Sequence, residues 1–114
     1  MSGVPARRVV AVTLGDPAGV GPEIALKAAA DPRVRERCRI VLFGDRRALD
    51  MHAQLCGMSI DCRTLSSASE IAGCSDELAI VHVDSLGEGL ELGRVAARYG
   101  AATVAALDAA VQAA

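Results

Sequence analysis

Apolar positions along the chain alternate between short continuous runs and helical spacings, and this alternation predicts an α/β fold. Apolar runs predict strands at residues 9–14, expected to be buried, and at 39–43 and 78–83, and a weaker strand is predicted at residues 60–65. Helices are predicted at residues 22–30, 45–56 and from 95 onward, with a short capped turn at 66–70. Strands that alternate with helices in this order favour a three-layer arrangement, a mostly parallel sheet with helices on both faces.

Turn and cap residues set the expected ends of these elements. Pro22 stands where proline is best tolerated, at the first helical position, and Asp31-Pro32 is expected to end that helix. Asp45 is a suitable N-cap for the second helix, and Gly57 a suitable C-terminal stop. The arginine-rich stretch 33–39 is interpreted as a mixed-charge surface connection.

The last predicted helix has one apolar face, made up of Val95, Tyr99, Ala102, Ala106, Ala110 and Val111. The sequence stops at Ala114 while this stripe is still running, with no cap and no breaker. We therefore expect residues 1–114 to be the front part of one larger α/β domain, with the remainder of the protein missing. The alternative is a terminal helix that packs back on its own sheet. An incomplete core also predicts self-association or marginal stability.

Composition narrows the classes of function. The chain has 114 residues, 52% of them apolar but 2% aromatic, and a net charge of −2. Nucleic-acid binding would favour a basic excess and stacking aromatic residues, and the sequence has neither. The six-residue apolar run near the N-terminus is too short for a signal peptide or a membrane span. A cytoplasmic chain with reduced thiols is the resulting expectation.

The cysteine and histidine spacings argue against a zinc site. Four cysteines are present without any C-x-x-C pair, and neither His52 nor His82 lies at ligand spacing from them. His82, inside a predicted strand, is interpreted as a core residue with a hydrogen-bond partner, and His52 as a helix-face residue. No metal ligand and no catalytic residue is therefore assigned.

The most informative segment is the loop from Gly15 to Glu23, which joins a predicted strand to a helix, where open α/β sheets bind ligands. It lacks the Gly-Lys-Ser/Thr of a P-loop, and its glycines do not have G-x-G-x-x-G spacing. Pro22 removes a backbone donor and Glu23 brings negative charge, so a phosphate held directly on this helix end is disfavoured.

What remains is a tight loop lining the cleft, with Gly15, Asp16, Gly19 and Gly21 as candidate cofactor-binding residues. The glycines allow positive φ or close approach of another group, and Asp16 can brace the loop by accepting from nearby N–H groups.

Residues 12–24, Val-Thr-Leu-Gly-Asp-Pro-Ala-Gly-Val-Gly-Pro-Glu-Ile, closely resemble the N-terminal signature of the 4-hydroxythreonine-4-phosphate dehydrogenases. The loop is also similar to Gly-Asp-Gly-Ile-Gly-Pro-Glu of the wider isocitrate and isopropylmalate dehydrogenase superfamily, and the Pro17-Ala18 insertion favours the first family. Residues 41–45 and 92–106 add weaker matches.

The resemblance implies an enzyme that uses NAD or NADP and a divalent metal (zinc, magnesium or manganese). It would oxidise and decarboxylate 4-phosphooxy-threonine on the route to pyridoxal phosphate, as a cytoplasmic homodimer. The resemblance places the family's metal-binding histidines and phosphate-binding basic residues beyond this chain, so the 114 residues alone are expected to be inactive. Two alternatives are a related phosphorylated threonate or erythronate dehydrogenase and a non-catalytic α/β binding module.

Other charged residues have simpler interpretations. Asp45 follows the second strand, where a dinucleotide fold would place a ribose-binding acid, but helix capping is favoured without the glycine fingerprint. A second set of residues could be offered as phosphate ligands but is interpreted as solvated surface: Lys27, Arg7, Arg8, Arg46 and Arg47.

Overall fold

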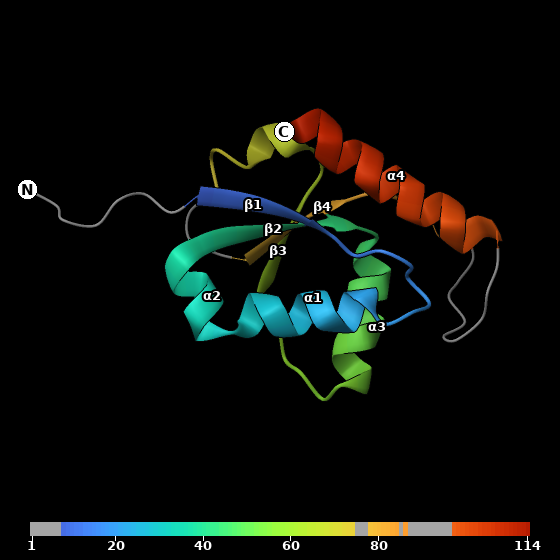
Figure 1. Cartoon of the computed structure of the whole chain (residues 1–114), viewed down its shortest axis with the longest axis horizontal. Coiled ribbons are helices and arrows are strands. Elements are labelled where there is room, and N and C mark those ends of the chain that lie inside the picture. The colour runs from blue at the N-terminus through green and yellow to red at the C-terminus, as the bar shows by residue number, and fades with distance from the viewer. Residues whose placement is uncertain (1–7, 75–77, 85, 87–96) are drawn as a thin grey trace, which may run out of the picture.

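The computed structural model describes residues 8–74, 78–84, 86 and 97–114 (side chains of 97 and 98 excepted), and their centre is a parallel four-stranded sheet (Figure 1). The strands are β1 (Arg8–Thr13), β2 (Cys38–Gly44), β3 (Cys62–Leu65) and β4 (Leu78–His82). Their order in the sheet is β1-β2-β4-β3, and every neighbouring pair is parallel. The predicted α/β class is confirmed.

Helices cover both faces of this sheet, as Figure 1 shows. One face carries α1 (Gly21–Ala30), α2 (Pro32–Arg37) and α3 (Arg46–Leu55), and the other carries the 3-10 turn η1 (Ala68–Glu70) and α4 (Ala97–Ala113). Strand alternation divides the core accordingly. Ile40 and Leu42 of β2 pack in the α1–α3 layer, whereas Val41 and Phe43 pack in the α4 layer.

Capping explains one helix that the sequence interpretation missed. Asp31-Pro32 ends α1 as predicted, but it also begins α2, because the Asp31 carboxylate accepts a hydrogen bond from the Arg33 backbone N–H at 2.9 Å. Proline at the first position of α2 needs no donor there. The surface position predicted for residues 33–37 is confirmed, but the helix was not predicted: residues 32–37 are helical with none buried, and 38–39 already belong to β2.

The predicted turn at 66–70 is confirmed as η1 together with the residues that lead into it. The Glu70 carboxylate accepts from the backbone N–H groups of Ser66, at 2.6 Å, and Ser67, at 3.1 Å. These backbone hydrogen bonds, from Ser67 first and then Ser66, hold the pKa of Glu70 below its usual value.

The buried face of α4 largely follows the predicted stripe. Four of its members are buried, namely Tyr99, Ala102, Ala106 and Ala110. Val111 is not, because it follows Ala110 by one residue and so lies about 100° further round the helix, where it is 64% exposed. Val95 lies outside the described residues. Among those described, no helix has both the length and the apolar character needed to cross a membrane.

Candidate functional site

Polar side chains gather where the parallel strands end. The Gly15–Gly21 loop follows β1, Asp45 follows β2, and Asp84 lies two residues beyond β4. Carboxyl ends of parallel strands share one edge of the sheet, and ligands of open α/β folds bind at that edge. This edge is therefore the candidate site.

Two of the three loop glycines are required, each for a different reason. Gly15 has a φ of 72°, in the left-handed region that favours glycine. Gly21 has no positive φ, but a Cβ placed on it would overlap the carbonyl oxygen of Leu14. The position of Gly19 does not require glycine: its φ is not positive, and an added Cβ would lie at an ordinary contact distance of 3.5 Å from Asp16 Cβ.

The loop is braced from within and from α3. Asp16 Oδ1 accepts from the Ala18 N–H at 2.9 Å, as predicted. His52 Nε2 lies 2.9 Å from the carbonyl oxygen of Pro17, and since that oxygen can only accept, Nε2 donates. The histidine is 6% exposed. A helix-face position was expected for it, but it faces inward and ties α3 to the loop.

The exit of the loop into α1 carries an ion pair. Lys27 Nζ lies 3.0 Å from Glu23 Oε1, and the Cys56 thiol donates to the same oxygen at 3.4 Å. The hydrogen bond from Lys27, followed by that from Cys56, lowers the pKa of Glu23. Burial, with the Glu23 carboxylate beside it, raises the pKa of the Cys56 thiol. Glu23 is thus an ionised partner of Lys27, which leaves this helix end unsuited to an anionic ligand.

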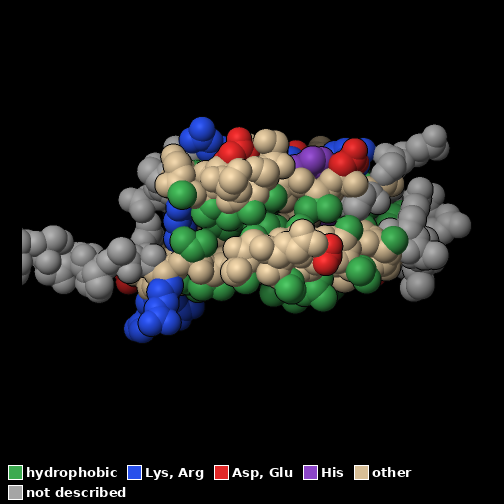
Figure 2. Space-filling view, turned by 90° about the horizontal axis from the view of Figure 1, so that it is seen from above, with side chains coloured by type: hydrophobic (Ala, Val, Ile, Leu, Met, Phe, Trp, Pro, Cys, Tyr) green, Lys and Arg blue, Asp and Glu red, His purple; other side chains and the backbone are tan. Residues whose placement is uncertain are grey.

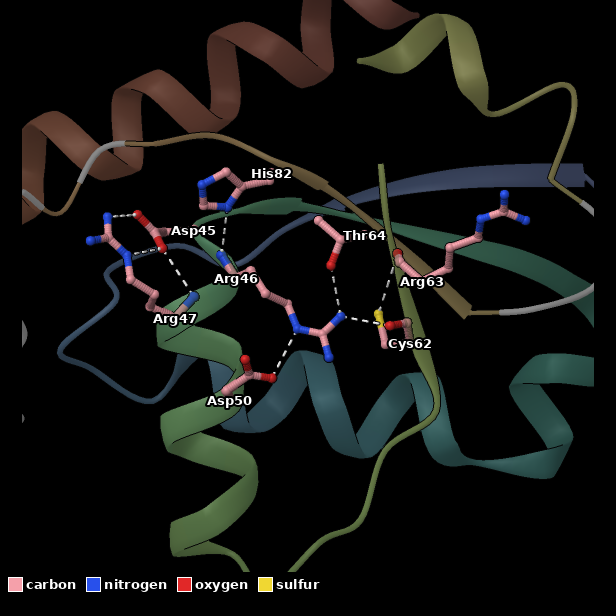
Figure 3. A network of polar contacts seen from close by, with 8 residues as sticks. All are labelled: Asp45, Arg46, Arg47, Asp50, Cys62, Arg63, Thr64 and His82. Atoms are coloured by element: carbon pink, nitrogen blue, oxygen red, sulfur yellow. Dashed lines mark hydrogen bonds and ion pairs between the residues drawn. The ribbon is translucent and has the colours of Figure 1, made fainter. Parts of the chain in front are cut away.

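Asp45, at the end of β2, is linked through Arg47 to Asp84, beyond the end of β4. Figure 3 shows the contacts between Asp45 and Arg47. Its carboxylate accepts from the Arg47 backbone N–H at 3.0 Å, as the N-cap of α3, and from Arg47 Nη2 at 2.7 Å. The same Nη2 donates to Asp84 Oδ1 at 2.9 Å. Asp45 first, and then Asp84, raise the pKa of Arg47. The predicted capping role of Asp45 is confirmed.

His82 is the last residue of β4 and has the hydrogen-bond partner that was predicted. Its Nδ1 accepts from the Arg46 backbone N–H at 3.0 Å (Figure 3). In the neutral ring the proton is therefore on Nε2. The side chain is half-buried rather than part of the core, because β4 ends here and the helices no longer cover it on all sides.

Three residues of ligand type meet at this edge although none was predicted as one. One ligand atom from each of Asp45, His82 and Asp84 lies within 4.8 Å of the others. Arg47 already bridges both carboxylates, and His82 Nδ1 is engaged by Arg46. A metal ion at this position would have to compete with Arg47 for both carboxylates, and in this arrangement the arginine holds the cluster together.

Arg46 is a structural residue rather than the solvated one expected. Its guanidinium reaches Asp50 at 2.9 Å, the Cys62 carbonyl oxygen at 2.6 Å and Thr64 Oγ1 at 3.1 Å, which ties α3 to β3 (Figure 3). Burial raises the pKa of the nearby Cys62 thiol to about 11. The structure records no contact of Lys27 or Arg8 with the cluster of Asp45, His82 and Asp84. Arg7 lies outside the described residues.

Comparisons with known proteins support the resemblance given by the loop. No family model matches the chain. A 4-hydroxythreonine-4-phosphate dehydrogenase of Trichlorobacter lovleyi is 41% identical over 69 residues, 60% of this chain and 20% of that protein. A D-threonate 4-phosphate dehydrogenase of Cupriavidus necator is 31% identical over 103 residues, 90% of this chain and 31% of that protein.

The fold has a close counterpart among solved structures. A terephthalate 1,2-cis-dihydrodiol dehydrogenase of Burkholderia xenovorans LB400 superimposes with a TM-score of 0.71 and 38% identity, over 95% of this chain and 30% of that one. The chain thus spans between 20% and 31% of the length of these proteins. Over nearly its whole length it resembles one part of the 4-hydroxythreonine-4-phosphate and D-threonate 4-phosphate dehydrogenases.

Proposed function

We propose that the chain is part of an NAD(P)-dependent and divalent-metal-dependent dehydrogenase that oxidises and decarboxylates 4-phosphooxy-threonine in pyridoxal phosphate biosynthesis. The observation that carries the proposal is the Gly15–Gly21 loop at the carboxyl edge of a parallel sheet, in a chain similar to proteins named for this activity. In this proposal residues 1–114 form the front part of one α/β domain in a longer chain. That longer chain would be a cytoplasmic homodimer.

Within such an enzyme, this chain would shape the edge on which cofactor and substrate lie. Gly15, Asp16, Gly19 and Gly21 belong to the proposed cofactor-binding loop, and the His52 hydrogen bond to Pro17 would hold that loop in one conformation. The nicotinamide ring would accept the hydride and the metal would polarise the substrate oxygen. The proposal assigns the metal no ligand in this chain, because Arg47 already bridges the carboxylates of Asp45 and Asp84.

Related substrates are the main alternatives. The similarity to the D-threonate 4-phosphate dehydrogenase extends over 90% of this chain, which favours a phosphorylated threonate or erythronate as the second candidate. The solved relative named for a cis-dihydrodiol adds a third substrate class. A non-catalytic α/β module is the alternative from outside the enzymes.

A segment exchange would test the proposal. The matching segments of the Trichlorobacter lovleyi and Cupriavidus necator enzymes are each replaced by residues 1–114, and both chimeras are assayed for NADH and NADPH formation with each substrate and with magnesium, manganese or zinc. We expect the Trichlorobacter chimera to keep a larger fraction of its parent's turnover of 4-phosphooxy-threonine than the Cupriavidus chimera keeps of its parent's activity, and we expect no turnover by the isolated 114 residues.

Each outcome of the exchange separates the candidates. If the Cupriavidus chimera keeps the larger fraction of its parent's activity, phosphothreonate replaces 4-phosphooxy-threonine as the proposed substrate, and the assignment as a dehydrogenase stands. A chimera that folds, dimerises and turns over none of the substrates would support the non-catalytic module. Turnover by the isolated chain would show that its own residues include the catalytic machinery.

A further inference from the structure

An apolar hollow lies on the α4 face of the sheet, between α4 and the residues around η1. It has a volume of about 570 Å³, and we call it the α4 hollow. Figure 2, which views this side of the molecule, shows hydrophobic side chains along the hollow between two ridges. Ligand sites in proteins are mostly apolar and measure about 300–1,000 Å³, so the α4 hollow has the size and the lining of one. Its lining includes Val9, Ala11, Val41, Phe43, Ile71 and Ala110, and among the described residues Ser69 is its only polar side chain.

Arg39 lies at one end of the α4 hollow. Side chains two residues apart on a strand share a face, so Arg39 is on the same side of β2 as Val41 and Phe43, which line the hollow. Its Nη1 donates to the carbonyl oxygen of Ile71, another lining residue, at 3.3 Å. Arg39 stands at the amino end of β2, whereas Asp45 of the candidate site follows the carboxyl end. The hollow with Arg39 is therefore a different place from the candidate site.

The guanidinium of Arg39 has an unused pair of donors. Its Nε and Nη2 are shielded from solvent and have no hydrogen-bond partner among the described residues. A shielded cation without a partner is energetically costly, and such a group calls for an explanation, of which a ligand is one. The two nitrogens lie on one edge of the planar group and donate in parallel, which matches the two oxygens of a carboxylate.

Two other arginines of this chain show what that edge of the guanidinium binds. Nε and Nη2 of Arg47 hold the two oxygens of Asp45, at 2.9 and 2.7 Å. Arg33 uses the same two nitrogens on Asp31, at 3.3 and 3.0 Å. Arg39 presents the same edge, and the described residues supply no carboxylate to it. The missing partner of Arg39 is therefore a carboxylate that comes with a ligand.

We propose that the α4 hollow binds an aliphatic monocarboxylate, at a second site that does not depend on the proposed dehydrogenase activity. The carboxylate would pair with Nε and Nη2 of Arg39, and the hydrocarbon chain would lie against Val41 and Phe43. Because both nitrogens are shielded from solvent, the guanidinium must move toward the hollow to receive the carboxylate. Phosphorylated or hydroxylated acids do not suit this lining, since their other polar groups would lose water without gaining partners.

Isothermal titration calorimetry of the 114-residue chain with three probes tests the site. We expect octanoate to bind saturably at one site per chain, since it has both a carboxylate and an apolar tail. Octan-1-ol has the tail without the charge, and its dissociation constant should be about tenfold or more higher. Acetate has the charge without the tail and should show no saturable binding. Octan-1-ol that binds as tightly as octanoate, or octanoate that does not bind saturably, would overturn the proposal.

Three variants locate the ligand. Arg39→Gln should raise the dissociation constant of octanoate about tenfold or more and leave that of octan-1-ol unchanged, because only the carboxylate contact is lost. Ala72→Phe, at an exposed lining residue, should weaken both ligands, since the ring would occupy the hollow. Arg33→Gln is the matched control, because Arg33 is an exposed arginine of α2 on the other face of the sheet. It should bind both ligands like the wild type.

Far-UV circular dichroism should show all three variants folded. Octanoate binding of wild-type strength in both Arg39→Gln and Ala72→Phe would place the ligand elsewhere and overturn the proposal, as would a loss confined to Arg33→Gln. None of these measurements involves the dehydrogenase substrates, so failure here leaves the segment-exchange test intact.

Discussion

Gly21→Ala tests the close approach on which the loop depends. The added methyl group would overlap the Leu14 carbonyl oxygen and lie 3.2 Å from the carbonyl carbon. Leu14 cannot easily yield, because it is 2% exposed and its N–H donates to the Phe43 carbonyl oxygen at 3.0 Å. Relief must come from a backbone shift at the start of α1. Overpacking of this kind costs about 1–3 kcal/mol, a large part of the stability of a small domain.

Gly19→Ala is the matched control in the same loop. Its methyl group would meet Asp16 Cβ at 3.5 Å, and its φ is not positive, so we expect a change within about 0.5 kcal/mol. Urea unfolding followed by circular dichroism measures both variants against the wild type, with equal slopes expected. If Gly21→Ala unfolds at the same urea concentration as Gly19→Ala, the close approach does not constrain the loop and the reasoning is refuted.

Three further predictions concern the braces around the site. His52→Ala should cost about 1–3 kcal/mol of unfolding free energy, since it leaves the Pro17 carbonyl without its donor; an unchanged urea midpoint would contradict this. Asp45→Ala should cost about 1–2 kcal/mol as a lost N-cap, whereas Asp84→Ala, at a side chain 79% exposed, should stay within about 0.5 kcal/mol; equal losses would refute the difference. Glu70 has a pKa below its ordinary 4.5, so its stabilisation is present above that value and is lost as pH falls through the lowered pKa. The stability difference between wild type and Glu70→Gln should therefore narrow in acid, and a difference that stays constant down to low pH would exclude this linkage.

Local signals in the sequence were sufficient for most elements. Apolar runs predicted three of the strands, and a weaker signal predicted β3. The strand that was expected to be buried, β1, is instead largely exposed, with Val9 at 49% and Val10 at 43%. Asp45 and Gly57 predicted both ends of α3, because caps and left-handed glycines act through backbone groups a few residues away. The short helix α2 was missed because Asp31-Pro32 is both a stop and a start. An Asp-Pro pair has the same local chemistry whether it ends one helix or begins the next. Only the path of the chain after the pair shows that a second helix follows.

The site itself was predicted only where it is continuous in sequence. The Gly15–Gly21 loop could be identified, and the bracing role of Asp16 spans two residues. The buried position of His52 could have been predicted from the sequence, since it lies on the same helix face as the buried Leu49 and Ala53. Its hydrogen-bond partner, the carbonyl oxygen of Pro17, is 35 residues away and could not be predicted from the sequence.

The sequence by itself determined the periods, the caps and the tight loop, because these depend on neighbours along the chain. Tertiary structure alone brought Asp45 to His82 and Asp84, since parallel crossovers return strands distant in sequence to one edge. It also decided that Arg47 occupies that cluster and that Val104, Leu107 and Val111 remain uncovered. A helix apolar on two sides has two equivalent choices in sequence, and only packing on the sheet selects the one that is buried.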